Sequence, residues 1–490
     1  MKERRKHKIS KTRLGDTMVN IIFFGGTGRM GEDCEFKYGI GKYLPDDWDV
    51  IIVSRVKEAK KYIKDEKKVK FEYIYDDEIF KRKLDKSEIE DAEKWLGHPL
   101  RALKHYSRSI KDVHDKELEK NVFEFAAKHI LFWKKYFKEK KPDIFSTTLI
   151  SELHETIPLI AAKKANVKAI NLFPGRVTNS NTLTDVEYNI IGWNKENYNS
   201  DEIDEYYDRI KSDYIARKQI SYPYMSEEVL RNLAMLSPRI SLKKIRQLRE
   251  YMRYKESNKP EICLESTKYF ISEYLKSVFR RVVVRNLFKP LEKGRKFFFF
   301  PLHYQIDAQM LYREPFFDQY DLVEQISHCL PYETLLYVKA HPHWGGSDVE
   351  YKRAKQLSKI QNIRFIPPTT SPYCLIDNAF ATITINSTTG FEAVILNKPV
   401  ITFGHEIYAK EGVSIIVRDL KDLPDIIFNI MKDPNYGIDI NKRKELIYKV
   451  FKNTIRLEGK FGLDYLIYTE NDYKNIAEAY VKAYKNYKII

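Results

Sequence analysis

Between Lys296 and Gly404, short apolar segments alternate with segments of helical length. The apolar segments include KFFFFPLHY, TLLYVKAHPHW and PVITFG, and segments such as TTGFEAVILN separate them. Apolar strands that alternate with helices at this spacing indicate a parallel sheet covered by helices on both faces. Ligands of such sheets bind beyond the carboxyl ends of the strands, so the loops after the strands are the candidate functional positions.

The N-terminal half shows a less regular version of the same alternation. Met18–Phe24 and Asp49–Arg55 have the apolar content of buried strands, with a glycine-rich segment between them. A charged helical region, 76–141, is followed by a predicted strand, helix and strand at Ile144–Thr148, Glu152–Ala165 and Lys168–Phe173. The Asn-rich segment 177–200 lacks a sustained period and is predicted to be a loop.

These patterns predict the α/β class, with two Rossmann-like domains facing a cleft, helical insertions and a C-terminal helix. The expected parts are a basic arm (1–13), an N-terminal Rossmann-like domain with helical insertions (14–290), a C-terminal Rossmann-like domain (291–465) and a helical tail (466–490). The cleft between the two domains is the expected place of the chemistry.

Composition excludes several classes of protein. Hydrophobic residues make up 43% of the chain and aromatic residues 13%, which excludes a largely disordered chain. No apolar run approaches the roughly 18–20 residues of a membrane-spanning helix, and the apolar stretch near the N-terminus is too short for a signal peptide. The four cysteines lie far apart in sequence, so we expect a reduced, cytoplasmic protein.

The chain is basic, with 85 Lys and Arg against 69 Asp and Glu and a formal net charge of +16. Much of this excess is scattered along helices, where a solvated surface is the usual explanation. The basic arm Lys2–Arg13 and the amphipathic segment 274–289 favour an anionic membrane surface, although a helix buried between domains has a similar pattern. No nucleic-acid-binding signature is present, so nucleic acid is not an expected partner.

The glycine-rich segment 26–31 (GTGRMG) matches a dinucleotide-binding loop, and Arg55 ends the next strand, as NADP binding would require. The stretch that follows contains two further glycines and a proline and predicts a poor continuous helix, which argues against NADP. Two alternatives stay open. The segment is a tight structural turn, or Gly26 and Gly28 let an acceptor sugar approach the backbone.

Two strand ends in the C-terminal half carry a more specific pattern. Lys339–Pro342 (KAHP) ends one strand, and Asn386–Ala393 (NSTTGFEA) joins another strand to a helix. Hydroxyls and amides at a helix start suit a diphosphate or phosphodiester, and the basic residues of the first motif would supply positive charge or a proton. The second motif also has a structural explanation, because Thr389 and Glu392 have the spacing of a capping box.

The stretch Phe297–Gly404 resembles the sugar-nucleotide-binding half of the capsule polysaccharide biosynthesis proteins, which include Kdo transferases and are GT-B glycosyltransferases. The segments that carry the resemblance are PLHYQIDAQML, LPYETLLYVKAHPHW and INSTTGFEAVILNKPVITFG, with the spacing between them. The His-Pro dipeptide and the Ser/Thr-rich turn are also similar to those of bacterial sialyl- and polysialyltransferases, which use CMP-sugars. Where relatives typically have Pro-Glu, this chain has Ile306-Asp307, so Asp307 takes the acidic role or the donor differs.

The resemblance implies that His341 acts catalytically on the donor phosphate, that Ser387 and Thr388 hold the same group, and that Glu392 binds the ribose. The full set of donor-binding residues that we expect is His303, Gln305, Asp307, Lys339, Pro342, Ser387, Thr388, Thr389, Gly390 and Glu392.

The N-terminal domain is expected to supply an acid or a base opposite the donor. Glu152, His154 and Glu155 begin the helix after the strand at 144–148, although carboxylates in a first helical turn are ordinary for reasons of helix dipole. Arg176 is a candidate for an anionic group on the acceptor, with a surface arginine as the alternative. No metal-ligand cluster is evident, so neither a metal nor a cofactor is expected.

The sequence thus predicts a GT-B glycosyltransferase that moves a sugar from a nucleotide donor, with a CMP-sugar of Kdo or sialic acid type favoured, onto a surface-glycan or lipid-linked acceptor. It would be cytoplasmic and peripheral on the inner face of the cell membrane. The alternatives are an NADP-dependent oxidoreductase that uses segment 26–31 and a non-catalytic glycan-binding scaffold.

Overall fold

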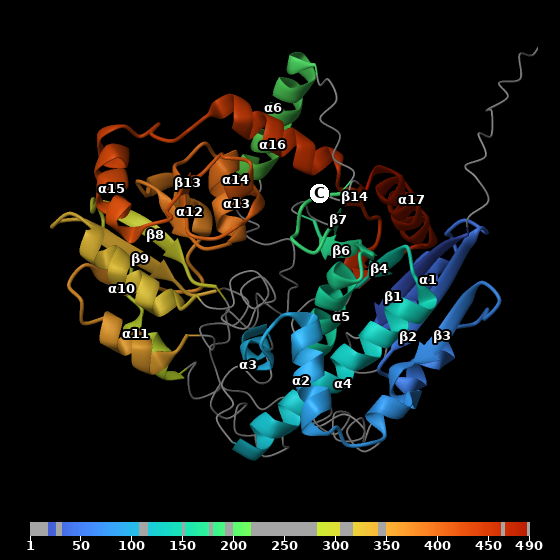
Figure 1. Ribbon diagram of the computed structural model, residues 1–490. Coiled ribbons are helices and arrows are strands. Elements are labelled where there is room, and N and C mark those ends of the chain that lie inside the picture. The colour runs from blue at the N-terminus through green and yellow to red at the C-terminus, as the bar shows by residue number, and fades with distance from the viewer. Residues whose placement is uncertain are drawn as a thin grey trace, which may run out of the picture.

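The computed structural model describes residues 18–25, 32–106, 116–148, 152–175, 180–191, 199–216, 282–303, 317–341, 349–461 and 466–487 (Figure 1). These residues form two α/β halves, each built on a parallel sheet, as the alternation of strands and helices predicts. The predicted fold class is therefore confirmed.

The sheet of the N-terminal half has the strand order β3-β2-β1-β4-β5, and all its pairings are parallel. Its strands are β1 (Val19–Gly25), β2 (Trp48–Ser54), β3 (Val69–Tyr73), β4 (Ile144–Ser146) and β5 (Lys168–Ala169). The central strands are almost fully buried, because helices cover both faces of a parallel sheet. The edge strand β3 was not predicted, since charged residues interrupt its sequence VKFEY as is common at sheet edges.

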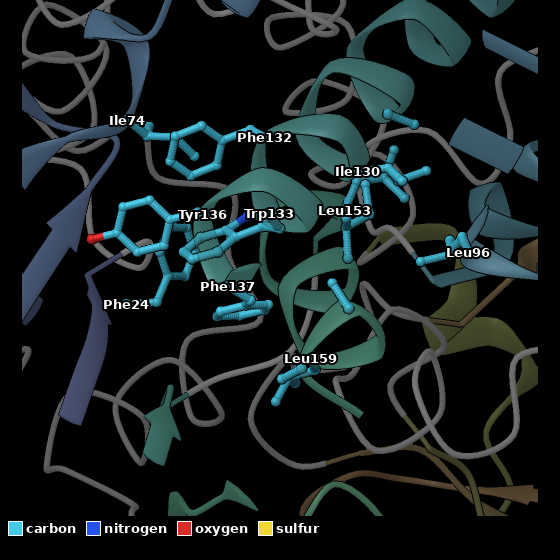
Figure 2. Close-up of a cluster of buried hydrophobic side chains, with 14 of the residues drawn as sticks. Phe24, Ile74, Leu96, Ile130, Phe132, Trp133, Tyr136, Phe137, Leu153 and Leu159 are labelled. Atoms are coloured by element: carbon cyan, nitrogen blue, oxygen red, sulfur yellow. The ribbon is translucent and has the colours of Figure 1, made fainter. Parts of the chain in front are cut away.

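Helices and short 3-10 turns cover this sheet. The helices are α1 (Glu32–Gly41), α2 (Lys86–Leu96), α3 (Leu100–Leu103), α4 (Lys116–Lys140) and α5 (Leu153–Lys164), and the turns are η1 (Lys57–Tyr62), η2 (Ile74–Asp76), η3 (Glu78–Phe80) and η4 (Lys104–Tyr106). Figure 2 shows the core between β1 and α4, where Phe24 meets Trp133 edge to face with ring centroids 5.5 Å apart. Trp133 also packs on Phe145 of β4, with ring centroids 5.4 Å apart, so this aromatic packing holds α4 against β1 and β4.

The prediction of a poor helix after residue 31 is wrong, because α1 is continuous from Glu32 to Gly41. Its glycine at position 39 serves close packing: a Cβ there would lie 2.5 Å from a ring carbon of Tyr473. A residue that weakens a helix in isolation is therefore retained where another helix must approach it.

The prediction of a loop over 177–200 is wrong in part. Residues Ser180–Thr184 form β7, which pairs antiparallel with β6 (Asn171–Pro174) and with β14 (Ile455–Arg456). The strand predicted at 168–173 is divided between β5 and β6, which belong to different sheets. Four of the five residues of β7 are polar but buried, so the strand lacks the apolar alternation on which the prediction depended.

The sheet of the C-terminal half has the order β10-β9-β8-β11-β12-β13. Its strands are β8 (Phe297–Pro301), β9 (Leu335–Lys339), β10 (Ile363–Ile366), β11 (Thr382–Thr384), β12 (Val400–Thr402) and β13 (Ile415–Ile416). Its helices are α10 (Gln319–Cys329), α11 (Tyr351–Leu357), α12 (Pro372–Asn378), α13 (Thr388–Ile395), α14 (Ile407–Lys410), α15 (Leu423–Lys432) and α16 (Ile440–Lys452). The strand order reverses between β8 and β11, as it does between β1 and β4 in the other sheet, and such switch points are the usual ligand positions.

The chain crosses between the halves more than once (Figure 1). Helix α6 (Ser200–Ala216) packs on α16, and its Tyr207 belongs to the core of the C-terminal half. Helix α17 (Glu470–Asn486) returns to pack on α1, with Tyr480 in the core of the N-terminal half. The remaining short elements are η5 (Arg285–Leu287), η8 (Leu420–Asp422) and the hairpin of β15 (Lys460–Phe461) and β16 (Leu466–Ile467). The domain limits drawn from the sequence stay a prediction.

The part of the chain that the structure describes contains no helix with the length and apolar content to cross a membrane. Of the predicted lipid-facing segments, the basic arm and residues 274–281 lie outside the described residues.

Candidate functional site

The switch point of the C-terminal sheet is organised by His303, which follows β8. The imidazole Nε2 accepts a hydrogen bond from the backbone N–H of Asn386, 3.2 Å away after β11. The side chain of Gln319 clamps the backbone of His303, accepting from its N–H at 2.9 Å and donating to its carbonyl at 3.1 Å. Burial lowers the pKa of His303 to about 4, against an opposing effect of Glu406, so the ring is neutral and positions Asn386.

The turn after β11 begins α13, and its cap differs from the predicted one. Ser387 is the N-cap, and its hydroxyl accepts a hydrogen bond from the Thr389 N–H at 3.1 Å. The N–H of Ser387 in turn donates to the Thr384 hydroxyl at 3.0 Å. The capping-box interpretation of Thr389 and Glu392 is therefore wrong, because Glu392 lies in the second turn of the helix. Its carboxylate is nevertheless buried in this half of the molecule.

Gly390 provides a close approach, and the group that approaches it is a protein side chain. A Cβ at this position would lie 2.7 Å from the Tyr408 hydroxyl oxygen. That hydroxyl donates to the carbonyl of Ser387 at 3.1 Å. Gly390 thus leaves room for the buried Tyr408, whose hydroxyl holds the Ser387 turn. Close packing against Tyr408 is by itself a sufficient explanation for a glycine at this position.

Lys339 and His341 stand at the carboxyl end of β9, beside β8 in the sheet. The Lys339 ammonium is buried and donates to the carbonyls of Ala340 at 3.3 Å and Pro368 at 3.1 Å. His303, His341 and Ser387 therefore follow three neighbouring strands, β8, β9 and β11, and lie at one edge of the sheet. Of the other predicted donor residues, Gln305, Asp307 and Pro342 lie outside the described residues.

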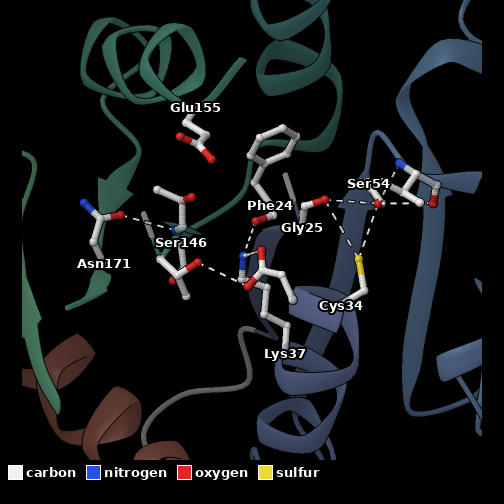
Figure 3. Close-up of polar contacts among 12 residues, drawn as sticks. Phe24, Gly25, Cys34, Lys37, Ser54, Ser146, Glu155 and Asn171 are labelled. Carbon is white, nitrogen blue, oxygen red and sulfur yellow. Dashed lines mark hydrogen bonds and ion pairs between the residues drawn. The ribbon is translucent and has the colours of Figure 1, made fainter. Parts of the chain in front are cut away.

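The switch point of the N-terminal sheet holds a buried ion pair that the sequence analysis missed (Figure 3). Lys37 of α1 is 1% exposed and donates to the Phe24 carbonyl at the end of β1 and to the Asp33 carboxylate at 2.7 Å. Asp33 also accepts from the Thr148 hydroxyl at 3.1 Å, beyond the end of β4. The sequence signal that could have identified this pair is the spacing of four residues between Asp33 and Lys37 in one helix.

A second group of contacts fixes the same edge. The Ser54 hydroxyl, at the end of β2, donates to the Gly25 carbonyl at 3.1 Å, and the Cys34 thiol donates to that hydroxyl at 3.3 Å. Burial, with Asp33 nearby, raises the pKa of Cys34 to about 11, so this thiol is protonated and unreactive at neutral pH. A hydrogen bond of 2.6 Å joins Ser146 of β4 to the Tyr480 hydroxyl of the C-terminal helix.

The predicted acid or base residues begin α5 beside this edge (Figure 3). Glu155 is 1% exposed, and its carboxylate accepts from the Glu152 N–H at 3.1 Å, so it also caps its own helix. The Nε2 atom of His154 lies 3.7 Å from the other Glu155 oxygen. The structure therefore brings His154 and Glu155 together. Gly26, Gly28 and Arg176 lie outside the described residues.

His129 of α4 is a further histidine that sequence reasoning missed. It is fully buried, with the rings of Phe125 and Phe80 centred 4.4 and 5.1 Å from its own. Burial lowers its pKa well below the ordinary value, and the nearby His154 and Arg55 act in the same direction. A single histidine in an amphipathic helix gives no sequence signal that it will be fully buried among aromatic rings.

A cavity of about 430 Å³ lies between the two halves, within the usual range of ligand pockets. Leu159 and Ile160 of α5 and Val186 line it from the N-terminal half, and His405 and Lys410 line it from the C-terminal half. A cavity is therefore present between the halves, and the residues that line it include none of the predicted donor-binding or acid–base residues that the structure describes. The α5 residues of the cavity follow Glu155 by about one helical turn.

Comparison with known proteins gives a family match that includes most of the C-terminal half, and two relatives that match over part of the chain. Residues 209–419 match the sequence model of the family described as "Capsule polysaccharide biosynthesis protein". Protein FixF of Sinorhizobium fredii is 32% identical over 140 residues, which are 28% of this chain and 33% of that protein. Capsule polysaccharide export protein KpsS of Escherichia coli is 28% identical over 148 residues, 29% of this chain and 37% of that protein. The matches span about a third of the length of these relatives.

Two solved structures show a distant similarity. The beta Kdo 2,7 transferase KpsC of Thermosulfurimonas dismutans is 13% identical, covers 71% of this chain and 89% of its own, and has a TM-score of 0.33. The S. aureus MnaA–UDP co-structure is 12% identical, covers 89% and 97%, and has a TM-score of 0.27. Residues 209–419, which contain β8 to β13 and the loops of His303, His341 and Ser387, are thus similar to the capsule polysaccharide biosynthesis family.

Proposed function

We propose that the protein is a GT-B glycosyltransferase of cell-surface polysaccharide synthesis. It would transfer a sugar from a nucleotide donor to a surface-glycan or lipid-linked acceptor in the cleft between its halves. The observation that carries this proposal is the pair of switch points: the family-matched half places His341 and the Ser387 turn at one sheet edge, and the other half places Glu155 at the start of α5.

The donor phosphate would lie at the start of α13. The partial positive charge of a helix N-terminus favours an anion, and the Ser387 and Thr388 hydroxyls are suited to hydrogen bonding with it. His341, at the end of β9, would supply a positive charge or a proton as the phosphate leaves. Gln305, Asp307 and Pro342 would complete this site, and a CMP-sugar is the favoured donor. The buried Lys339 ammonium would stabilise the donor phosphate through its positive charge.

Glu392 would bind the ribose. The correction of the cap at Ser387 removes the structural role that competed for this carboxylate. An ionised carboxylate accepts two hydroxyl protons, which suits a ribose diol.

On the acceptor side, Glu155 would act as the base. The N–H of Glu152 donates to one oxygen of the Glu155 carboxylate at 3.1 Å, which fixes the orientation of the group at the start of α5. His154 is the neighbouring candidate, with its Nε2 atom 3.7 Å from a Glu155 oxygen, and Glu152 is the second carboxylate candidate. Arg176, Gly26 and Gly28 would contact the acceptor. We expect no metal or other cofactor in this transfer.

We further propose a cytoplasmic location, peripheral on the inner face of the cell membrane. The basic arm Lys2–Arg13 and segment 274–289 would bind anionic lipid through a salt-screened field. Flotation with anionic vesicles that disappears at high salt is the expected result, and equal flotation with neutral vesicles would contradict it.

The structure of α1 keeps NADP binding as an alternative that the nucleotide-binding experiment must test. The continuous α1 after segment 26–31 restores the helix that a dinucleotide site needs, so the sequence argument against NADP no longer holds. An NADP-dependent enzyme would bind NADPH in a manner that Arg55→Ala weakens. A non-catalytic scaffold would bind no nucleotide at all.

The decisive experiment is a thermal-shift series on the full chain with CMP, UDP, GDP, ADP and NADPH. A ligand at about 100 times its Kd stabilises the folded state by roughly 2.7 kcal/mol, which a melting curve resolves. We expect one nucleoside diphosphate or monophosphate to stabilise the wild type and the control Glu445→Gln, an exposed change on α16, but to stabilise Glu392→Gln less. Stabilisation by NADPH alone, or by no nucleotide, would overturn the proposal.

A further inference from the structure

The turn at residues 185–189 is built around the Asp185 carboxylate. Its oxygens accept from the N–H of Glu187 at 2.8 Å, from the N–H of Asn189 at 2.9 Å and from the Asn189 side-chain amide at 2.8 Å. Tyr188 has a positive φ of 62°, which a non-glycine residue adopts at an energetic cost. Its ring packs edge to face on Phe173, with centroids 5.0 Å apart, and this packing holds the strained turn in place.

This turn presents two oxygen atoms to a cation from the other half of the molecule. The Lys410 ammonium of α14 donates to the Glu187 carbonyl at 2.8 Å and to the Asn189 side-chain oxygen at 2.8 Å. Asp185 fixes both acceptors before the lysine arrives, so only the lysine side chain has to be ordered. The turn is a preorganised receptor for one ammonium group.

Each partner is tied to a predicted part of the transfer site. On the C-terminal side, α14 is fixed to the donor turn, because Tyr408 donates to the Ser387 carbonyl at 3.1 Å. On the N-terminal side, Glu187 pairs with Lys163 of α5 at 2.9 Å, and α5 begins with the residues His154 and Glu155. The contacts thus run from the Ser387 turn, through Lys410, to the helix that carries Glu155.

We propose that Lys410 and the Asp185–Asn189 turn form an interdomain latch that sets the distance between the Ser387 turn and the first turn of α5. Lys410 is then a positioning residue, since it lines the cavity between the halves and acts through the elements that it joins. The effect of the latch on transfer rests on the proposed function, whereas its effect on the spacing of the halves does not.

The spacing is measured on the full chain by pulsed electron–electron double resonance. One spin label is attached at Cys374, exposed on α12 of the C-terminal half, and the other at Lys86→Cys, exposed on α2 of the N-terminal half. Cys263 and Cys329 are changed to Ser in the same background, and Cys34 is buried. Lys410→Met removes the latch, and Lys410→Arg retains a cation with several donors. Lys444→Met is the matched control, because it removes a lysine contact of the same 2.8 Å length, which joins α16 to Asp204 of α6 at the surface.

We expect one narrow distance distribution for the wild type, Lys444→Met and Lys410→Arg, and a broader or longer distribution for Lys410→Met. An unchanged distribution in Lys410→Met would overturn the latch. With a donor and an acceptor in hand, Lys410→Met should lower kcat roughly three- to tenfold with the donor KM unchanged, in keeping with the modest strength of an exposed charged contact, and Lys410→Arg should restore it. If the wild type binds no nucleotide, the proposed function fails while the distance measurement still decides the latch.

Discussion

The two switch points are built by different chemistry. In the C-terminal half a neutral imidazole and hydroxyl groups hold the strand ends, through His303 and Ser387. In the N-terminal half a buried ion pair does so, through Lys37 and Asp33. The C-terminal site has the partial positive charge of the α13 N-terminus and the buried Lys339 ammonium at one edge of the sheet, whereas the N-terminal site pairs its lysine with an aspartate. The difference favours the C-terminal side for the proposed anionic donor.

The largest expected effect comes from breaking the ion pair of the N-terminal site. Lys37→Met leaves the Asp33 carboxylate buried opposite an apolar side chain, which costs about 3–5 kcal/mol of the free energy of unfolding. Urea denaturation of the full chain measures it. The control is Lys42→Met, which removes a more exposed lysine 3.5 Å from Glu470 and should change stability by less than about 1 kcal/mol. Equal losses in the two variants would show that the pair has no special role.

The second-largest expected effect is a pH dependence of the free energy of unfolding, caused by the neutral His303 of the C-terminal site. The pKa of His303 is about 4 in the folded protein and near 6.5 in the unfolded chain, so between these values the unfolded state binds the additional proton. Stability is therefore complete above pH 6.5 and falls as the pH is lowered towards 4, by on the order of 3 kcal/mol from this group.

The measurement is the free energy of unfolding as a function of pH in the wild type and in His303→Gln. His129 has a lowered pKa as well and contributes with the same sign, so the wild-type slope contains both. We expect His303→Gln to flatten part of the slope between pH 6.5 and 4 and His129→Phe to flatten another part. Parallel curves for the wild type and His303→Gln would contradict a neutral, buried His303.

The third prediction tests whether the C-terminal site binds the donor as the comparison requires. Glu392→Gln should weaken nucleotide binding roughly tenfold or more, because a charge-assisted acceptor becomes a donor, with a cost of about 1.5–3 kcal/mol. The melting temperature of the free protein should change little, since Glu392 does not cap α13. Isothermal titration with the nucleotide found in the thermal-shift series measures the affinity. Wild-type affinity in this variant, together with wild-type turnover in His341→Ala, would refute the donor site.

Strands β8, β9 and β11 of the C-terminal sheet are predictable because each is a short buried run followed by a motif with chemistry, whereas the two-residue strand β13 was not predicted. His303, His341 and Ser387 follow such strands, so the rule of carboxyl ends assigns them to one edge of the sheet from the amino-acid sequence alone. The polar strand β7 and the glycine-containing helix α1 are not predictable, since burial of polar residues and close packing by Tyr473 come from distant parts of the chain.

Contacts between distant parts of the chain also limit how much of the two sites can be predicted from the sequence. Asp33 and Lys37 were within reach of a local rule, because four residues separate them in one helix. The contacts of Lys410 join residues more than 200 positions apart and depend on a turn shaped by Asp185. No local pattern contains that information.

The smallest expected effect is the change in stability on substituting Ser387. Measured together with nucleotide affinity, it distinguishes a capping role of Ser387 from a ligand-binding role. Ser387→Ala removes the hydroxyl that accepts from the Thr389 N–H, and loss of an N-cap costs about 1 kcal/mol of stability. Ser387→Asp retains a capping oxygen but brings a negative charge to the proposed phosphate position. We therefore expect near-wild-type stability and a larger loss of nucleotide affinity for Asp than for Ala. The comparison variant in the N-terminal half is Asp85→Ala, which removes the cap of α2 and should lower stability by a similar amount without changing nucleotide binding. If Ser387→Asp bound nucleotide as tightly as Ser387→Ala, the start of α13 would carry a cap alone, and the anion would have to lie elsewhere in the cleft.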